Sequence, residues 1–329
     1  MKVTENTTLN EIISNLGWQD RAYMVDPMAK LDTGMDLDEG LGSSVPFKSF
    51  ADWSLRKICA ALVVWNIPSV AEGLQHLVDA CACGQVFYDF RPGTGTGLAA
   101  FTLRQRSRCA VICAGGGYEN VCSAAEGYPI AAALNKMGIS AFVVHYRTGK
   151  DARAPGPMDD LAAAVRYIAD NADALNVDMT DYALIGFSAG GHLAASFGTQ
   201  TLGYAKYGLP KPGCVILGYP VITMGKHAHQ GSRDVLLGPD AAADDIEHYS
   251  VERQVNSSYS PTFLWQCEAD DCVPVENSRM MADALKKAGV PCKYEIFPGS
   301  AHGWGRGDGT TAEGWLDRAV EFCRNQERA

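Results

Sequence analysis

The sequence predicts an α/β fold built on a mostly parallel sheet, and the alternation of two kinds of segment supports this prediction. From about residue 108 onward, apolar runs of strand length alternate with amphipathic runs of helical length. The strand candidates are residues 109–115, 140–147, 182–187, 214–220, 262–268 and 293–299. The helix candidates between them include residues 125–137, 159–175, 189–200 and 276–288. Continuous apolar strands joined by helical crossovers are typical of a parallel sheet covered by helices on both faces.

The composition of the 329-residue chain is that of an ordinary globular protein. Hydrophobic residues make up 47% and charged residues 20%, which allows a large buried core and argues against wholesale disorder. A formal net charge of −10, without a clustered stripe of Lys and Arg, disfavours nucleic acid as a main partner. No apolar run approaches the roughly 18 residues of a membrane helix, so we expect no membrane partner.

The cysteine content and the N-terminal residues both bear on the compartment. Eleven cysteines, an odd number scattered through a long chain, favour reduced thiols over a disulfide framework. The first residues lack the charged start, apolar core and cleavage site of a secretory signal. We therefore expect a cytoplasmic protein.

Two regions fall outside the alternation of strands and helices. Residues 1–85 carry apolar residues at helical spacing, notably in 55–66 and 69–81, and predict a helical segment that packs on the core or forms a cap. Residues 86–329 are expected to form the main domain. Within it, residues 221–260 are rich in His, Gly, Asp and Ser and separate two core strands, as is typical of a lid or binding loop.

A serine surrounded by glycines lies in the segment GFSAGGHLA, residues 186–194, where Ser188 is flanked by Gly186 and Gly190. The pattern G-x-S-x-G is a weak signal by itself. Here it follows a strand candidate and opens a helix candidate, which is the context that a nucleophile elbow requires. The small neighbours would leave room for a reactive serine on a tight turn.

A serine hydroxyl needs a base to take its proton and a carboxylate to orient that base. In enzymes with such an elbow, the three residues follow the order Ser, Asp or Glu, His. Asp270 and Asp271 come directly after one predicted strand, and His302 comes after the next. Because the carboxyl ends of parallel strands share one edge of the sheet, we expect Ser188, His302 and one of the two aspartates to meet there.

The remaining histidines compete poorly as the base. His192 lies four residues after the serine on the same helix and is expected to pack near the elbow. His145, within a strand, and His76, in the N-terminal helical region, are expected to be structural. His227 and His229 form a His-Ala-His pair in a loop, and we expect surface residues rather than metal ligands.

Three consecutive glycines in CAGGGYEN, residues 113–120, end the first strong strand candidate. A flexible turn is one interpretation, but the position and composition match the HGGG-type loop that supplies N–H groups to a developing oxyanion. We expect those donors to be Gly115, Gly116 and Ala189, the residue after the serine.

Several segments share one family pattern: AGGGY, HYR, DDLAAAVRYI, GFSAGGHLAA, YPVITM, GSRDVLLG, PTFLWQCEADDCVPVENS and FPGSAHG. Together they resemble the esterase/lipase branch of the α/β-hydrolase fold that includes acetylxylan-esterase-like and feruloyl-esterase-like proteins. The resemblance implies that fold over about residues 86–329, with Ser188 as nucleophile, His302 as base and Asp270 as acid. Asp270 is preferred over Asp271 because the family's acid usually stands four residues before the proline of a Val-Pro motif. The glycine loop differs from the pattern in having Ala114 where relatives often carry His or Pro.

The function implied by this resemblance is that of a serine carboxylic ester hydrolase that works through an acyl-enzyme without metal or organic cofactor. Its substrates would be small-molecule esters with short acyl or small aryl-acyl groups, including acetylated sugars. Tyr118, Trp304 and the insertion would line the pocket, although Trp304 is equally suited to packing.

Two alternatives remain open. A serine peptidase of the prolyl-oligopeptidase type shares the elbow, but it usually carries a propeller that 85 helical residues cannot build. A non-catalytic, ligand-binding scaffold generally lacks one of the three side chains, and here none is missing. The sequence does not decide the oligomeric state, and a homo-oligomer is possible.

Overall fold

A central sheet of eight strands organises the computed structural model, which describes residues 1–26, 50–62, 65–84, 86–91 and 95–326. The strands are β1 (Phe87–Arg91), β2 (Thr96–Phe101), β3 (Ser107–Cys113), β4 (Ser140–His145), β5 (Val177–Phe187), β6 (Cys214–Gly218), β7 (Thr262–Cys267) and β8 (Cys292–Phe297). Their order in the sheet is β1-β2-β4-β3-β5-β6-β7-β8. β2 runs antiparallel to both of its neighbours, and every pair from β4 to β8 is parallel. The predicted mostly parallel sheet is confirmed, and all six predicted strands are present.

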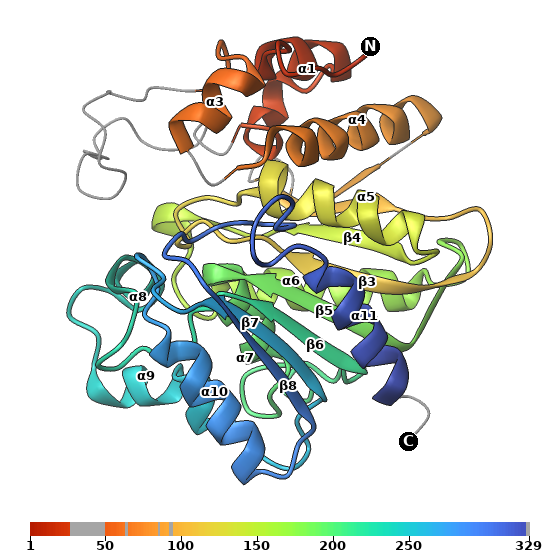
Figure 1. Ribbon diagram of the computed structural model, residues 1–329. Helices are drawn as coiled ribbons and strands as arrows, with labels where there is room; N and C mark the ends of the chain where they lie inside the picture. The colour runs from red at the N-terminus through yellow and green to blue at the C-terminus, as the bar shows by residue number, and fades with distance from the viewer. Residues whose placement is uncertain (27–49, 63–64, 85, 92–94, 327–329) are drawn as a thin grey trace.

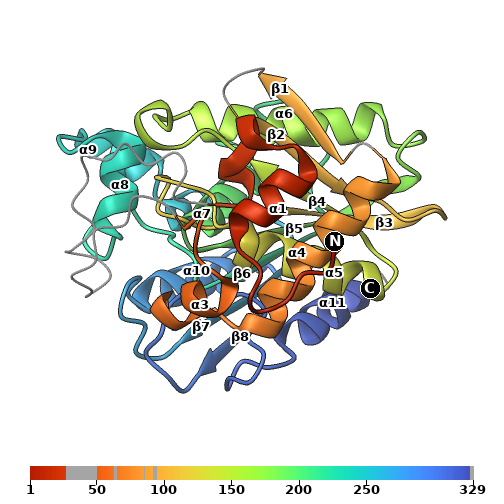
Figure 2. The same ribbon diagram turned by 90° about the horizontal axis from the view of Figure 1, so that it is seen from above.

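Helices cover both faces of this sheet (Figures 1 and 2). One face packs against α5 (Tyr128–Lys136) and α11 (Trp315–Gln326). The opposite face packs against α6 (Gly156–Asp170), α7 (Ser188–Phe197) and α10 (Glu276–Lys287). Because apolar layers lie on both sides, the residues of β4 and β6 are buried throughout. A two-sided core of this kind holds the carboxyl ends of the strands in fixed positions.

The N-terminal helices form an outer layer above α5 (Figure 1). They are α1 (Leu9–Leu16), the 3₁₀ helix η1 (Gln19–Met24), α3 (Leu55–Leu62) and α4 (Ile67–Cys83). The predicted helix over 55–66 is thus present up to Leu62, and residues 63–64 lie outside the described residues, as do 27–49 and 85 of the same predicted segment. Within the described ranges, no helix combines the length and apolarity needed to cross a membrane.

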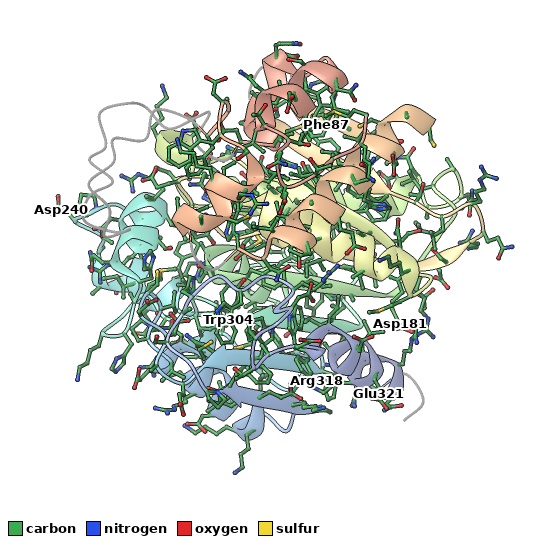
Figure 3. The ribbon with its side chains drawn as sticks, turned by 45° about the horizontal axis from the view of Figure 1, so that its top comes forward. Phe87, Asp181, Asp240, Trp304, Arg318 and Glu321 are labelled. Atoms are coloured by element: carbon green, nitrogen blue, oxygen red, sulfur yellow. A yellow bond between two sulfur atoms is a disulfide. The ribbon has the colours of Figure 1, made fainter. Side chains whose placement is uncertain are left out.

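Close contacts join this layer to the sheet domain. A Cβ atom on Gly73 of α4 would lie 2.5 Å from the backbone nitrogen of Pro129, so only glycine lets α4 approach α5 this closely. Phe87 of β1 lies beneath the layer (Figure 3), with the Arg21 guanidinium 5.4 Å from the centre of its ring. Leu74 and Leu77 are fully buried in the same apolar cluster. The N-terminal helices therefore share a core with the sheet domain.

The insertion at residues 221–260 folds into α8 (Gln230–Leu237), α9 (Ala243–His248) and the 3₁₀ turn η4 (Val251–Arg253). Its first residues are held by Asn277 of α10, whose Oδ1 accepts the N–H groups of Ile222 and Thr223 at 2.8 and 3.1 Å. Short helices here were not predicted, because the segment has little apolar periodicity. The role of the insertion as a lid stays a prediction.

The remaining elements are the π-helical turn η2 (Ser123–Gly127) and the 3₁₀ turn η3 (Gly149–Asp151).

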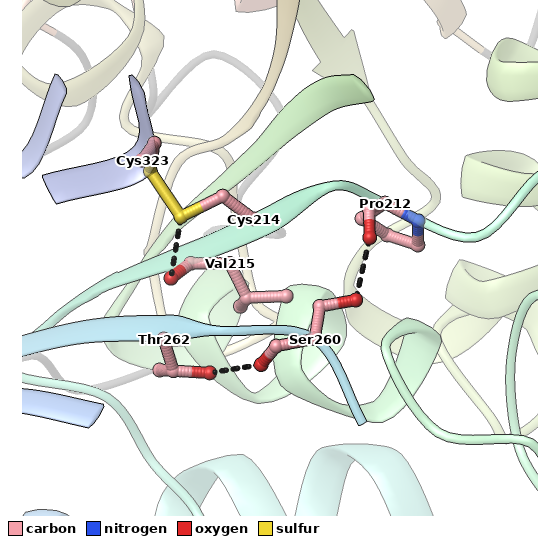
Figure 4. The surroundings of a disulfide bond; sticks show 6 residues. All are labelled: Pro212, Cys214, Val215, Ser260, Thr262 and Cys323. Atoms are coloured by element: carbon pink, nitrogen blue, oxygen red, sulfur yellow. Dashed lines mark hydrogen bonds between the residues drawn. A yellow bond between two sulfur atoms is a disulfide. The ribbon is translucent and has the colours of Figure 1, made fainter. Parts of the chain in front are cut away.

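A disulfide between Cys214 and Cys323 joins the start of β6 to α11 (Figure 4), with 5.7 Å between their Cα atoms. The expectation of reduced thiols is wrong for this pair. The two cysteines stand 109 residues apart, and nothing in such a separation indicates that they meet. The nine other cysteines are free in the structure.

The disulfide should contribute to stability by limiting the freedom of the unfolded chain. A disulfide typically contributes about 2–4 kcal/mol. We predict that Cys323→Ser lowers the free energy of unfolding by about that amount in guanidinium melts without reductant. Cys83→Ser, at an exposed free thiol, is the control and should leave the melt unchanged. Equal stability of wild type and Cys323→Ser would contradict a stabilising disulfide at this position.

Candidate active site

The turn from β5 to α7 presents a serine in a strained backbone conformation. Ser188 has φ +51°, in the left-handed region that residues with a Cβ rarely adopt. A Cβ on Gly186 would lie 2.4 Å from the carbonyl oxygen of Gly190, and a Cβ on Gly190 would lie 2.3 Å from that of Ala114. The glycines around the serine are therefore required by close backbone approach, as the sequence predicted for an elbow.

Ser188, His302 and Asp270 form a hydrogen-bonded row. The Nε2 atom of His302 lies 2.9 Å from Ser188 Oγ, and its Nδ1 atom lies 2.9 and 3.1 Å from the two carboxylate oxygens of Asp270. A carboxylate only accepts hydrogen bonds, so Nδ1 carries the proton of the neutral ring and donates a hydrogen bond to Asp270. Nε2 is then free to accept the proton of the serine hydroxyl.

The Asp270 carboxylate is held in place from several sides. It accepts the backbone N–H groups of Cys272 and Val273 at 3.0 and 2.9 Å and the side-chain amide of Gln266 at 3.1 Å. Its side chain is completely buried. Asp271, the other candidate, is exposed to solvent. Of the two aspartates, the structure brings Asp270 to the histidine.

The fold explains how three distant segments meet. β3 lies between β4 and β5, so the strand order reverses at β3, and ligand sites of α/β sheets form outside the carboxyl ends of the strands at such a point. Ser188 follows β5, Asp270 follows β7 and His302 follows β8, all at that edge.

The glycine loop after β3 lies against the serine. A Cβ on Gly115 would be 2.8 Å from the Cβ of Ser188. The carbonyl of Ala114, at the position where the family pattern often has His or Pro, accepts the hydroxyl proton of Tyr146 at 2.6 Å. Tyr146 thus braces the loop in this chain.

The three predicted oxyanion donors differ in their surroundings. Ala189 is the second residue of α7, and the first N–H groups of a helix have no carbonyl partner within it. The structure contains no hydrogen bond from the Gly116 N–H to any described residue. The Gly115 N–H, in contrast, donates to Glu126 Oε2 at 2.6 Å. The Gly115 N–H is therefore already engaged, and the geometry favours the N–H groups of Gly116 and Ala189 as the oxyanion donors.

Two residues near the site were missed by sequence reasoning. Glu126 is 4% exposed, and its Oε1 accepts the hydroxyl proton of Tyr219 at 2.7 Å. The Tyr219 ring meets the His302 ring edge-on, with 4.7 Å between their centres. Burial raises the pKa of Glu126, while hydrogen bonds from Tyr219 and Gly115 and the charge of protonated His302 oppose that rise. The available signal was that Glu126 is the single charged residue between Glu119 and Lys136.

The two residues predicted to bind substrate also differ. Tyr118 is 1% exposed, and its hydroxyl is hydrogen-bonded to His192 Nδ1 at 2.8 Å. Its hydroxyl is therefore engaged within the core, which does not support a substrate contact. Trp304 lies on the loop between β8 and α11 (Figure 3), half-buried against Gly299. A substrate contact by Trp304 stays a prediction.

Three histidines have the structural surroundings that the sequence predicted. His192 accepts the Tyr118 hydroxyl at Nδ1, and its Nε2 lies 2.8 Å from the carbonyl oxygen of Tyr249. His145 is buried within β4, and His76 of α4 lies 3.0 Å from the side-chain oxygen of Asn135.

His229 lies nearer to the site than its position in a loop suggested. Its Nδ1 accepts the backbone N–H of Ser232 at the start of α8. Burial lowers its pKa, the charge of His302 lowers it further, and Asp270 opposes this. Within the described ranges, neither His229 nor His227 belongs to a group of three or more potential metal ligands.

The sheet order, the elbow after β5 and the Asp and His loops after β7 and β8 define an α/β-hydrolase. Comparison with known proteins supports this assignment. The BD-FAE family profile matches residues 102–209. An acetyl ester-xyloside bifunctional hydrolase from Caldicellulosiruptor lactoaceticus superposes with a TM-score of 0.62 and 34% identity, over 71% of this chain and 87% of that one. The chain therefore belongs to the esterase/lipase family of the α/β-hydrolase fold, which confirms the resemblance read from its motifs.

Two curated relatives are larger proteins. Endo-1,4-β-xylanase B of Butyrivibrio fibrisolvens is 36% identical over 217 residues, which is 63% of this chain. An acetylxylan esterase of Xylanibacter ruminicola is 35% identical over 205 residues, or 61% of this chain. The chain spans only 34% and 42% of the length of these relatives.

His192 should make stability depend on pH. Burial lowers its pKa to about 4, whereas the unfolded chain takes up the proton near the ordinary value of about 6.5. The resulting stabilisation is complete above about pH 6.5 and is lost as the pH falls towards 4, by up to about 3 kcal/mol. We predict that His192→Gln is less stable at pH 7 and loses less stability than wild type between pH 6.5 and 4 in urea melts. Parallel pH profiles for the two proteins would contradict this.

Proposed function

We propose that this chain is a serine carboxylic ester hydrolase that acts through an acyl-enzyme on short-chain acyl or small aryl-acyl esters. The observation that supports the proposal most directly is the hydrogen-bonded row of Ser188, His302 and Asp270. In this proposal the three side chains are a catalytic triad.

Acylation begins when Ser188 Oγ attacks the ester carbonyl carbon and His302 Nε2 takes the hydroxyl proton. The carbonyl oxygen becomes an oxyanion and accepts hydrogen bonds from Gly116 and Ala189. Removing one such donor typically costs about 3–4 kcal/mol of barrier stabilisation. Asp270 keeps the proton on Nδ1 before the attack and stabilises the imidazolium afterwards.

Collapse of the tetrahedral intermediate releases the alcohol, which takes the proton from His302 Nε2. Water then enters, gives a proton to His302 and attacks the acyl carbon, and a second collapse returns the proton to Ser188 as the acid leaves. The mechanism requires no metal or organic cofactor.

The substrate class is proposed from the relatives. One curated relative is named an acetylxylan esterase, and the solved hydrolase is named for acetyl ester and xyloside cleavage. These names support acetyl groups on sugars as the first substrates to test. Trp304 and the insertion at residues 221–260 would line the pocket. His229 would add a donor there, since its Nδ1 is engaged by Ser232 and its Nε2 then carries the proton.

The organisation of the chain is also a proposal. We propose an N-terminal helical segment, residues 1–85, that packs on a catalytic domain, residues 86–329, rather than an independent unit. The shared core around Leu74 and Leu77 supports the packing of this segment on the catalytic domain. A cytoplasmic location is proposed from the predominance of free thiols.

Replacing the nucleophile tests the proposed function. We predict that Ser188→Ala lowers kcat/KM for 4-nitrophenyl acetate by roughly 10⁵-fold or to background, and abolishes labelling by a fluorophosphonate. Ser196→Ala is the matched control, because it removes a buried serine hydroxyl from the same helix, away from His302. The control should keep both activity and labelling.

A substrate panel separates the alternatives. Acetylated xylosides, feruloyl esters and acyl chains of graded length should be cleaved far faster than aminoacyl anilides. Preference for the anilides would favour a serine peptidase instead. A wild-type protein that neither cleaves esters nor reacts with the fluorophosphonate would be a ligand-binding scaffold.

A further inference from the structure

Glu126 is a buried carboxylate that the proposed mechanism does not use. It is 4% exposed, and among the described residues it makes no salt bridge. A buried charge without a cationic partner is costly unless hydrogen bonds compensate for lost water. Glu126 lies on the π-helical turn η2, directly before α5, a type of turn that often occurs at functional sites.

Both oxygens of this carboxylate accept hydrogen bonds, one from the glycine loop and one from Tyr219, which follows β6. Oε2 accepts the Gly115 N–H at 2.6 Å, and Oε1 accepts the Tyr219 hydroxyl at 2.7 Å. The Tyr219 oxygen in turn accepts the Gly305 N–H at 2.9 Å. One chain of hydrogen bonds thus connects the glycine loop after β3 to the loop that carries His302.

Each of the two connected loops adjoins a group of the reaction centre. Gly115 immediately precedes the proposed donor Gly116 and lies against Ser188. Gly305 lies three residues after His302, and Tyr219 packs edge-on against the His302 ring. Displacing either loop by about 1 Å would misplace a donor or the base, which can cost on the order of 100-fold in rate.

The hydrogen bonds favour the ionised form of Glu126. The ionised carboxylate accepts both hydrogen bonds as they stand. Burial raises the pKa of Glu126, and these bonds act against that rise. The negative charge favours the imidazolium of His302 but disfavours a nearby oxyanion. These two effects oppose each other, whereas fixing the two loops helps both groups.

We infer that Glu126 is a positioning residue that sets the oxyanion loop and the His302 loop relative to each other. The inference rests on the proposed ester hydrolysis and adds a fourth side chain to the machinery. Glu126 touches no reacting atom in this account and acts through Gly115 and Tyr219.

Graded variants test the inference with 4-nitrophenyl acetate as substrate. Glu126→Ala removes both hydrogen bonds and should lower kcat by about 100-fold with KM changed less than about threefold. Glu126→Gln keeps one oxygen for Gly115 and should recover most of this loss, to within about tenfold of wild type. The split between kcat and KM arises because the loops act on the transition state rather than on binding.

A double-mutant cycle tests the connection through Tyr219. Tyr219→Phe removes the hydroxyl that joins Glu126 to Gly305 and should lower kcat by about tenfold. Because both residues act in one chain of hydrogen bonds, Glu126→Ala with Tyr219→Phe should be no slower than Glu126→Ala alone. If the double variant lost kcat by the product of the two single losses, the proposed chain of hydrogen bonds would be overturned.

A matched control separates positioning from stability. Asp160 is also a buried acid, 1% exposed, but it accepts its hydrogen bonds from the backbone and guanidinium of Arg147 and from neither of the loops that Glu126 connects. Asp160→Asn should lower the melting temperature and leave kcat per active site unchanged, as counted by fluorophosphonate titration. Unchanged kcat per titrated site in Glu126→Ala would overturn the inference. A wild type without esterase activity would instead overturn the proposed function on which it rests.

Discussion

The 2.9 Å hydrogen bond between Ser188 Oγ and His302 Nε2 is the contact on which the proposed chemistry depends. The serine is fixed by a buried helix, but the histidine lies on a long loop between β8 and α11. Asp270 and Tyr219 hold the ring from two sides. Further along this loop, Arg306 donates to Glu72 of α4 at 2.6 Å. The N-terminal helices thus help to hold the loop that carries the base.

The site combines backbone strain with rigid surroundings. Ser188, Tyr219 and Tyr118 adopt φ values of +51°, +37° and +65°, conformations that each cost on the order of 1–3 kcal/mol in residues with a Cβ. Such strain persists only where neighbouring structure enforces it. Here the sheet, packed on both faces, enforces it at the carboxyl ends of the strands. The strained turn then needs no reorganisation when the substrate binds, which is how preorganised sites stabilise transition states.

The sequence predicted the parts of this molecule that depend on local pattern. Each of the six strands from β3 to β8 contains an apolar run visible in the sequence, although β8 also carries Lys293 and Glu295, and the order of Ser188, Asp270 and His302 follows the order of the strands. β1 and β2 were missed because their five and six residues carry mixed burial or a glycine, without a clear alternation. Glu126 and the Cys214–Cys323 disulfide were missed for another reason. Each joins segments far apart in the chain, and only the folded structure places the partners together.

The most direct test of the account is detection of the acyl-enzyme. Wild-type protein mixed with excess 4-nitrophenyl acetate, quenched in acid within its first turnover and digested, should yield an acetylated peptide with the acetyl group on Ser188. The release of nitrophenol should show a burst of about one equivalent per labelled site. Full ester hydrolysis with no acetyl group on Ser188 at any quench time, and undiminished in Ser188→Ala, would contradict the central claim.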